Sequence, residues 1–220
     1  SGLDITTTGT VTIQDVNFDA NTNTSSSDDG AAAYISSSST ATFDRCKFTN
    51  NTNANNNSSE GSCIYSEGTL TVQNCLFYDN TITYSADNGC VALDDGTSTV
   101  INCTFADNQD VAIWVKAGTH NITNCIFKDN VGDDIERDGG TVNLTYSWYE
   151  AVTGTIASTT GSTTSGSVDF VDQANDDYRI GYSSACNNAG TSSGAPSVDF
   201  AENARNGDGS GFDMGAYEYV

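Results

Sequence analysis

The feature that most constrains this chain is an internal repeat that ends in an aromatic residue. Five segments align without gaps and a sixth, degraded copy follows: residues 12–18, 42–48, 71–77, 99–105, 121–127 and 143–149. Their aromatic positions are separated by 30, 29, 28, 22 and 22 residues. A unit this short cannot bury its own apolar side chains, whereas stacked units bury them against one another. The repeat therefore predicts a solenoid.

Apolar columns within the repeat indicate short strands. The aromatic column is Phe18, Phe48, Phe77, Phe105 and Phe127, and two residues before it stands a thiol column of Cys46, Cys75, Cys103 and Cys125. Residues two apart on a strand point to the same face, so both columns are expected to enter one core. An aliphatic column lies three residues before the thiols, and this odd spacing predicts a bend between two strands.

The residue at the predicted bend is Asn74, Asn102 or Asn124 in three of the copies. Asparagine tolerates the left-handed backbone that such a bend requires. Stacked asparagines can also form a hydrogen-bonded ladder between coils.

A second apolar block closes each of the first four coils. We align Ala32, Cys63, Cys90 and Val111 in one column and Tyr34, Tyr65, Ala92 and Ile113 in another, and expect both to point inward. Together the columns predict an all-β fold, a right-handed single-stranded parallel β-helix of about six coils. Residues 1–150 are expected to form the coils, and residues 151–220 the final coil or coils and a C-terminal cap of the same domain.

Two short patterns carry family resemblances. The Phe-x-x-Asn pattern, which begins at each of the five phenylalanines, resembles the repeat of polymorphic outer-membrane proteins, a parallel β-helix family of adhesins and autotransporter passengers. The patterns DFVD at 169–172, DYRI at 177–180, NAG at 188–190 and DMGAYEY at 213–219 resemble the end of choice-of-anchor Q proteins of bacterial surfaces. The resemblances imply a secreted or surface-displayed protein.

The charge balance excludes some partners. Asp and Glu number 29 against 7 Lys and Arg, for a formal net charge of -22. Such a surface repels nucleic-acid phosphates. No apolar run approaches the roughly 18 residues of a membrane span, so none is predicted. We expect a non-catalytic extracellular or cell-surface structural or adhesive protein. At its N-terminal edge we expect self-association, head-to-tail into a fibre, or continuation into a longer parent chain.

Three alternatives remain open. A polysaccharide-active lyase or hydrolase would need three convergent carboxylates, or a Lys or Arg above bound calcium. A glycan-binding module could use Tyr78 and Tyr84 near the insertions of the first three coils. An ice-binding protein could use the outer face of one strand column, where Thr-x-Thr pairs recur at Thr10 and Thr12, Thr40 and Thr42, Thr69 and Thr71, and Thr97 and Thr99.

The cysteines and one glycine-rich loop are the remaining candidates for special chemistry. Stacked coils would hold the seven cysteines either as buried thiols or as two or three disulfides between coils. Asn206, Asp208, Ser210 and Asp213 place oxygen ligands at intervals in a loop that could bind calcium. No catalytic residue and no required cofactor is predicted.

Overall fold

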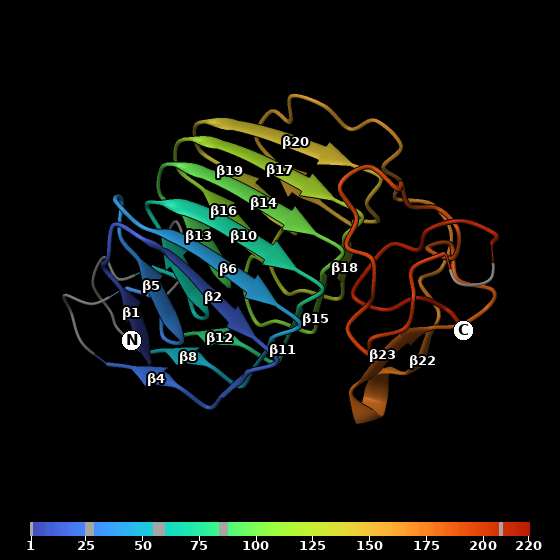
Figure 1. The fold of residues 1–220 in the computed structure, drawn as a ribbon, viewed down its shortest axis with the longest axis horizontal. Helices are drawn as coiled ribbons and strands as arrows, with labels where there is room; N and C mark the ends of the chain where they lie inside the picture. Colours follow the sequence, from blue (N-terminus) through green and yellow to red (C-terminus); the bar gives the residue numbers. More distant parts are fainter. Residues whose placement is uncertain (1, 25–28, 55–59, 84–87, 207–208) are drawn as a thin grey trace.

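The computed structural model describes residues 2–24, 29–54, 60–83, 88–206 and 209–220, and its regular structure consists almost wholly of short parallel strands (Figure 1). Successive coils place matching strands side by side, which creates sheets that run along the stack. Six coils carry the sheets and a seventh, irregular turn follows them, so the predicted parallel β-helix is confirmed.

Four parallel sheets make up the stack. Sheet A contains β1 (Leu3–Ile5), β5 (Ala33–Ile35), β9 (Ile64–Ser66), β13 (Val91–Leu93), β16 (Ile113–Val115), β19 (Ile135–Arg137) and β21 (Val152–Thr153). Sheet B contains β2 (Thr10–Gln14), β6 (Thr40–Asp44), β10 (Thr69–Gln73), β14 (Thr97–Ile101), β17 (Thr119–Thr123) and β20 (Thr141–Thr145). Sheet C contains β3 (Asn17–Asp19), β7 (Lys47–Thr49), β11 (Leu76–Tyr78), β15 (Thr104–Ala106) and β18 (Ile126–Lys128). Sheet D, formed where the first three coils are longer, contains β4 (Thr22–Asn23), β8 (Thr52–Asn53) and β12 (Thr81–Ile82).

The aromatic column forms a stack through the core. Phe48, Phe77 and Phe105 pair in register between neighbouring strands of sheet C. The ring centroids along the whole column, from Phe18 to Phe127, are 4.7, 4.6, 4.4 and 5.1 Å apart and the rings are nearly parallel. Phe48, Phe77, Phe105 and Phe127 are fully buried. Offset stacking at these distances adds to the burial of apolar area.

Left-handed residues turn the chain at two corners of each coil. The predicted bend between sheets B and C is confirmed in all six copies, with φ between 47° and 57° at Asp15, Arg45, Asn74, Asn102, Asn124 and Tyr146. A second such corner, which we did not predict, follows sheet C, with φ between 54° and 57° at Ala20, Asn50, Asp79, Asp107 and Asp129. Asparagine and aspartate occupy most of these positions because their short polar side chains tolerate this backbone.

The inward prediction for the second apolar block is confirmed for Ala32, Cys63 and Cys90, which lie in the core, and is wrong for Val111 and for Tyr34, Tyr65 and Ala92. Ala33, Ile64, Val91 and Ile113 pair with one another and point into the core, whereas Tyr34, Tyr65, Ala92 and Trp114 form the outward column. The alignment of the fourth block, which contains Ile113, was also displaced by one residue, because Ile113 pairs with Val91 rather than with Ala92. An irregular step before β5 and before β9 brings two successive side chains into the core. Ala32 and Ala33, for example, both donate their amide N–H to the carbonyl of Cys63.

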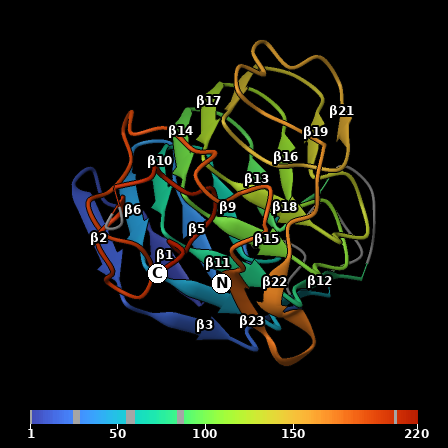
Figure 2. The same cartoon turned by 90° about the vertical axis from the view of Figure 1, so that its right-hand side faces the viewer.

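The last quarter of the chain has two separate roles. Residues 154–165 cover the final coil, where the bridges Asn143–Ser158 and Trp148–Thr163 extend sheets B and C by single contacts. The C-terminal segment is our name for residues 166–220, and its described residues, 166–206 and 209–220, lie along the flank of the stack (Figure 2). The segment includes an antiparallel hairpin made of β22 (Phe170–Asp172), the short 3-10 helix η1 (Gln173–Asn175) and β23 (Asp177–Ile180). The cap that we expected at the end of the stack is therefore mainly a cover on its side.

Candidate functional site

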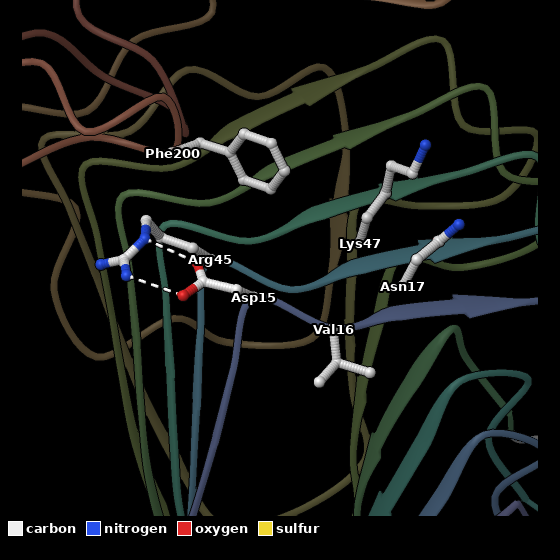
Figure 3. Close-up of a pocket in the computed structure, with 6 residues that line it drawn as sticks. All are labelled: Asp15, Val16, Asn17, Arg45, Lys47 and Phe200. Carbon is white, nitrogen blue, oxygen red and sulfur yellow. Dashed lines mark hydrogen bonds and ion pairs between the residues drawn. The ribbon is translucent and has the colours of Figure 1, made fainter.

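Two hollows lie where the C-terminal segment meets the outer face of sheet C. Side chains on β11, β15 and β18 are covered by this segment: Tyr178 packs on Tyr78, and Gly215 approaches Thr104 and Ile126. The equivalent positions of the first two coils lie beyond its edge. Where the C-terminal segment meets the first two coils lies a hollow of about 270 Å³, here called the Phe200 hollow (Figure 3). It is lined by Asp15, Val16, Asn17, Arg45, Lys47 and Phe200.

An ion-pair network fixes one wall of the Phe200 hollow. The Arg45 guanidinium donates to both carboxylate oxygens of Asp15, at 2.8 and 3.1 Å, and to Asp44 at 3.1 Å. Glu202 of the C-terminal segment lies 3.6 Å from the same guanidinium. Because the Arg45 side chain is only 9% exposed, this network holds both the bend and the segment in place.

The opposite wall of the Phe200 hollow is polar and its floor is apolar. Asn17 and Lys47 pair in register at the starts of β3 and β7, in Figure 3 their side chains extend in the same direction, and Phe200 lines the same hollow. Among the residues that the structure describes, the Lys47 ammonium forms no ion pair; it lies 5.8 Å from the centroid of the Tyr78 ring. Val16 completes the hollow and is 37% exposed. An aromatic face, an amide, an ammonium and a carboxylate thus surround one small space.

The second hollow, here called the acidic groove, has a volume of about 640 Å³. Its lining residues come from the second left-handed corner of the third and fourth coils and from the hairpin: Asp79, Asp107, Gln109, Gln173, Ala174, Asp176 and Tyr178. Three carboxylates therefore converge at the surface.

Asp107 is held by the hairpin. The side-chain amide of Gln173 donates to both oxygens of Asp107, at 3.0 and 2.9 Å, and to Asp129 at 3.0 Å. The Tyr178 hydroxyl donates to Asp107 at 2.9 Å. Asp79 differs, because partial burial and the nearby charges of Asp176 and Asp107 raise the pKa of its carboxyl. The groove thus combines one anchored carboxylate with one that retains its proton more readily.

The threonine columns occur as predicted on the outer face of sheet B. Thr10, Thr40, Thr69 and Thr97 pair in register, and so do Thr12, Thr42, Thr71 and Thr99. The members are exposed or half-buried. The ice-binding interpretation of this array stays a prediction. The prediction that Tyr78 is a surface contact is wrong, because Tyr178 covers it and leaves it 7% exposed. Tyr84 lies outside the described residues.

The proposed calcium loop is placed only in part, since Asp208 lies outside the described residues. Asp213 is 2% exposed and accepts the backbone N–H groups of Asn188 and Tyr219, at 2.6 and 2.5 Å. The side chain of Asn206 accepts the N–H of Gly211, and Ser210 is exposed. In the described parts of the chain no three His, Cys, Asp or Glu side chains are grouped so as to hold a metal ion. Calcium binding stays a prediction.

The asparagine ladder occurs at a different column from the one we predicted. Asn102 and Asn124 do contact each other at 3.3 Å, but Asn74 bonds Asp44 and Arg205, and Asn102 and Asn124 also bond the backbone of the C-terminal segment. The continuous ladder uses the asparagine of the Phe-x-x-Asn pattern: Asn21, Asn51, Asn80, Asn108 and Asn130 are joined by side-chain bonds of 2.8 to 3.0 Å. The recurrence of this asparagine in the sequence was a sufficient signal for it.

All seven cysteines are buried free thiols in the structure. Those of the thiol column take part in a relay between coils. The N–H of Cys75 donates to the sulfur of Cys103 at 3.4 Å, and that sulfur lies 3.4 Å from the carbonyl oxygen of Ile101. In the sixth coil, Ser147 takes the same place and its hydroxyl accepts the N–H of Cys125 at 3.0 Å. Each position of the thiol column therefore needs a small side chain that both accepts and donates a hydrogen bond.

The hollows involve residues that the sequence did not single out as members of a site. Phe200, Gln173 and Tyr178 have no repeat pattern, and nothing in the sequence places them beside the coils. Asp79 and Asp107 could have been found, because an Asn or Asp stands two residues after Phe in the second to fifth coils.

The geometry defines a parallel β-helix with surface hollows on one flank, and the comparisons agree. The chain matches the family described as a right-handed β-helix region over residues 1–170, and it belongs to that family. No curated protein and no solved structure matches the chain. Within the described residues, no helix has the length and apolar character to cross a membrane.

Proposed function

We propose that the protein is a non-catalytic structural and adhesive protein of an extracellular or cell-surface setting that binds glycan in the Phe200 hollow. The observation that carries this proposal is the placement of the Phe200 ring in the same hollow as Asn17 and Lys47. The C–H face of a sugar ring packs on an aromatic side chain, and its hydroxyl groups bond amide, ammonium and carboxylate groups. The volume of about 270 Å³ suits one or two sugar residues of a longer chain.

Charge decides which glycans fit best. The net charge of -22 repels polyuronates at long range, and the one unpaired ammonium of the hollow, from Lys47, offsets little of it. A neutral polysaccharide carries no such penalty. We therefore expect binding of neutral glycans to exceed binding of polygalacturonate, with the difference narrowing as salt screens the repulsion.

Binding to neutral and uronate polysaccharides, measured by calorimetry or affinity electrophoresis, tests the proposal. Phe200→Ala and Lys47→Ala should each weaken binding about tenfold or more, which corresponds to a loss of roughly 1.4 kcal/mol. Tyr182→Ala is the matched control, because this aromatic side chain is 78% exposed and lines neither hollow. Equal binding by all variants with unchanged thermal unfolding would contradict the proposal.

The acidic groove favours a second candidate, a polysaccharide hydrolase. Glycoside hydrolysis uses two carboxyl groups, one of them protonated, and burial together with the charges of Asp176 and Asp107 raises the pKa of the Asp79 carboxyl, the direction that favours a general acid. Against this stands the anchoring of Asp107 by Gln173 and Tyr178, together with the exposure of Asp79 and Asp176 to solvent. Release of reducing ends that Asp79→Asn abolishes would establish the hydrolase; binding without release favours the adhesive protein.

Self-association is part of the proposal for the N-terminal edge. Strands β1, β2, β3 and β4 each pair on one side only, and Phe18 stacks on Phe48 through one face. The far end is covered by residues 154–165, so pairing between two first coils is favoured over head-to-tail stacking. Light scattering should reveal a dimer that dissociates when Val11→Lys places a charge at this edge; a monomer at all concentrations would remove the idea.

A further inference from the structure

Cys63 and Cys90 differ from the other buried thiols in how closely their sulfurs approach. They lie on neighbouring coils just before β9 and β13, and their Sγ atoms are 2.9 Å apart. An S–S bond measures about 2.05 Å, so a small side-chain rotation brings the sulfurs to bonding distance. The thiol column is arranged otherwise, because its sulfurs face backbone groups; Cys75, for example, lies 3.2 Å from the carbonyl oxygen of Gln73.

The local backbone explains why this pair can meet. Side chains directly opposite each other on parallel strands point the same way, which disfavours the torsion of a disulfide. Here, however, the N–H groups of Cys63 and Ile64 both donate to the carbonyl of Cys90, at 2.9 and 3.2 Å. Two amides on one acceptor mark an irregular step in the pairing, where the two side chains are freed from the parallel arrangement.

We infer that Cys63 and Cys90 form a disulfide bond between the third and fourth coils, at a step where the long coils change to short ones. Two S–H bonds are broken and one S–S bond is formed. The two electrons and two protons pass to an oxidant such as glutathione disulfide, which becomes two glutathione thiols through a mixed disulfide. The remaining five cysteines stay as thiols.

Burial sets when the bond forms. Cys63 is 0% exposed and Cys90 1% exposed, so an oxidant does not reach them in the closed stack. Burial and the neighbouring Cys90 raise the pKa of the Cys63 thiol, which makes its reactive thiolate scarce once the chain has folded. The bond is therefore made during folding. Its persistence in the native setting rests on the proposed extracellular location, whereas its formation can be tested on the chain alone.

The test is refolding of the reduced, denatured chain in a buffer of reduced and oxidised glutathione. Free thiols are then counted in denaturant, and the acid-quenched protein is mapped by mass spectrometry without reduction. We expect five free thiols instead of seven and one linked pair of peptides that contain Cys63 and Cys90. The oxidised protein should melt about 5–15 °C above the reduced one, since the bond closes a loop of nearly thirty residues.

Two variants complete the test. Cys75→Ser, from the thiol column, should leave four free thiols after oxidative refolding and retain the linked peptides. The double variant Cys63→Ser with Cys90→Ser should have five free thiols whether it is refolded with or without oxidised glutathione, and no linked pair of peptides. Seven free thiols in the refolded wild type would overturn the inference, and so would a link confined to the thiol column. A chain that binds neutral glycan but keeps seven thiols would refute the disulfide alone.

Discussion

The side-chain amide of Asn80 donates to the side-chain oxygen of Asn108 at 2.9 Å, and that oxygen also accepts the backbone N–H of Asn80 at 3.2 Å. The amide of Asn80 further donates to the carbonyl oxygen of Phe48 at 2.9 Å. Both asparagines are 1% exposed. One side chain per coil thus satisfies the buried backbone groups of the corner that follows sheet C, where the strand ladder itself is interrupted.

Replacement of Asn80 by Ala should cost about 2–4 kcal/mol of unfolding free energy. The change leaves two donors of Asn51 and the carbonyl of Phe48 without their partners in a buried place. Asn21→Ala is the matched control at the half-buried first rung, and it should cost about 0.5–1.5 kcal/mol. Urea titration measures both. Similar costs for the two variants would show that the ladder is not a main source of stability.

Replacement of Cys103 by Ser should be tolerated better than replacement by Val. Serine can accept the N–H of Cys75 and donate to a carbonyl, as Ser147 does in the sixth coil. Valine fills the space but leaves that N–H without an acceptor, at a cost of about 1–3 kcal/mol. Chemical unfolding of both variants gives the order, and a valine variant at least as stable as the serine variant would contradict the relay.

Arg205 should be the main electrostatic link between the C-terminal segment and the coils. Its fully buried guanidinium donates to Glu218 at 2.9 Å and to Asn74 of the third coil at 2.7 Å. Arg205→Met retains volume but leaves Glu218 buried without its partner, which should cost about 3–5 kcal/mol. Arg179→Met removes an exposed pair with Asp177 and should leave the free energy of unfolding almost unchanged.

Limited proteolysis shows where the Arg205 variant loosens. Cleavage is expected first within residues 166–220, while the coils remain protected. Adding Glu218→Gln should restore part of the lost stability. Equal stability of the two arginine variants would count against a structural role for the buried pair.

Asp213 should make the attachment of the C-terminal segment sensitive to pH. Burial raises the pKa of this carboxyl from its ordinary value of 3.8 to about 6. The folded chain therefore binds this proton more tightly than the unfolded chain. The resulting stabilisation is fully present below about pH 4 and is lost as the pH rises through 6.

The comparison with Asp213→Asn isolates this effect from the other carboxyl groups. From pH 4 to pH 7 the stability of the wild type relative to the variant should fall by about 1–2 kcal/mol, less than the full shift implies because solvent screens part of the charge. Unfolding curves at several pH values measure the difference. A difference that does not change with pH would contradict the shifted titration.

The sequence predicts those parts of the fold that repeat. The spacing between Phe77 and Cys75 places both in the core, and Asn102 at the odd step predicts the bend, because each coil repeats the same local chemistry. The contact of Arg205 with Asn74 joins residues 131 positions apart and occurs once, so no sequence pattern predicts it. Both hollows depend on the C-terminal segment, which has no repeat. The repeat could therefore have indicated single residues such as Asp79, but it could not have predicted the hollows themselves.

Sheet D gives the two ends of the stack different perimeters. Coils one to three have four strands and coils four to six have at most three, since β12 has no successor. A copy added end to end would set a wide turn against a narrow one, and β4 would have no strand to pair with. The taper therefore gives the stack a direction, and the proposed pairing through the wide end would close after two copies instead of growing without limit.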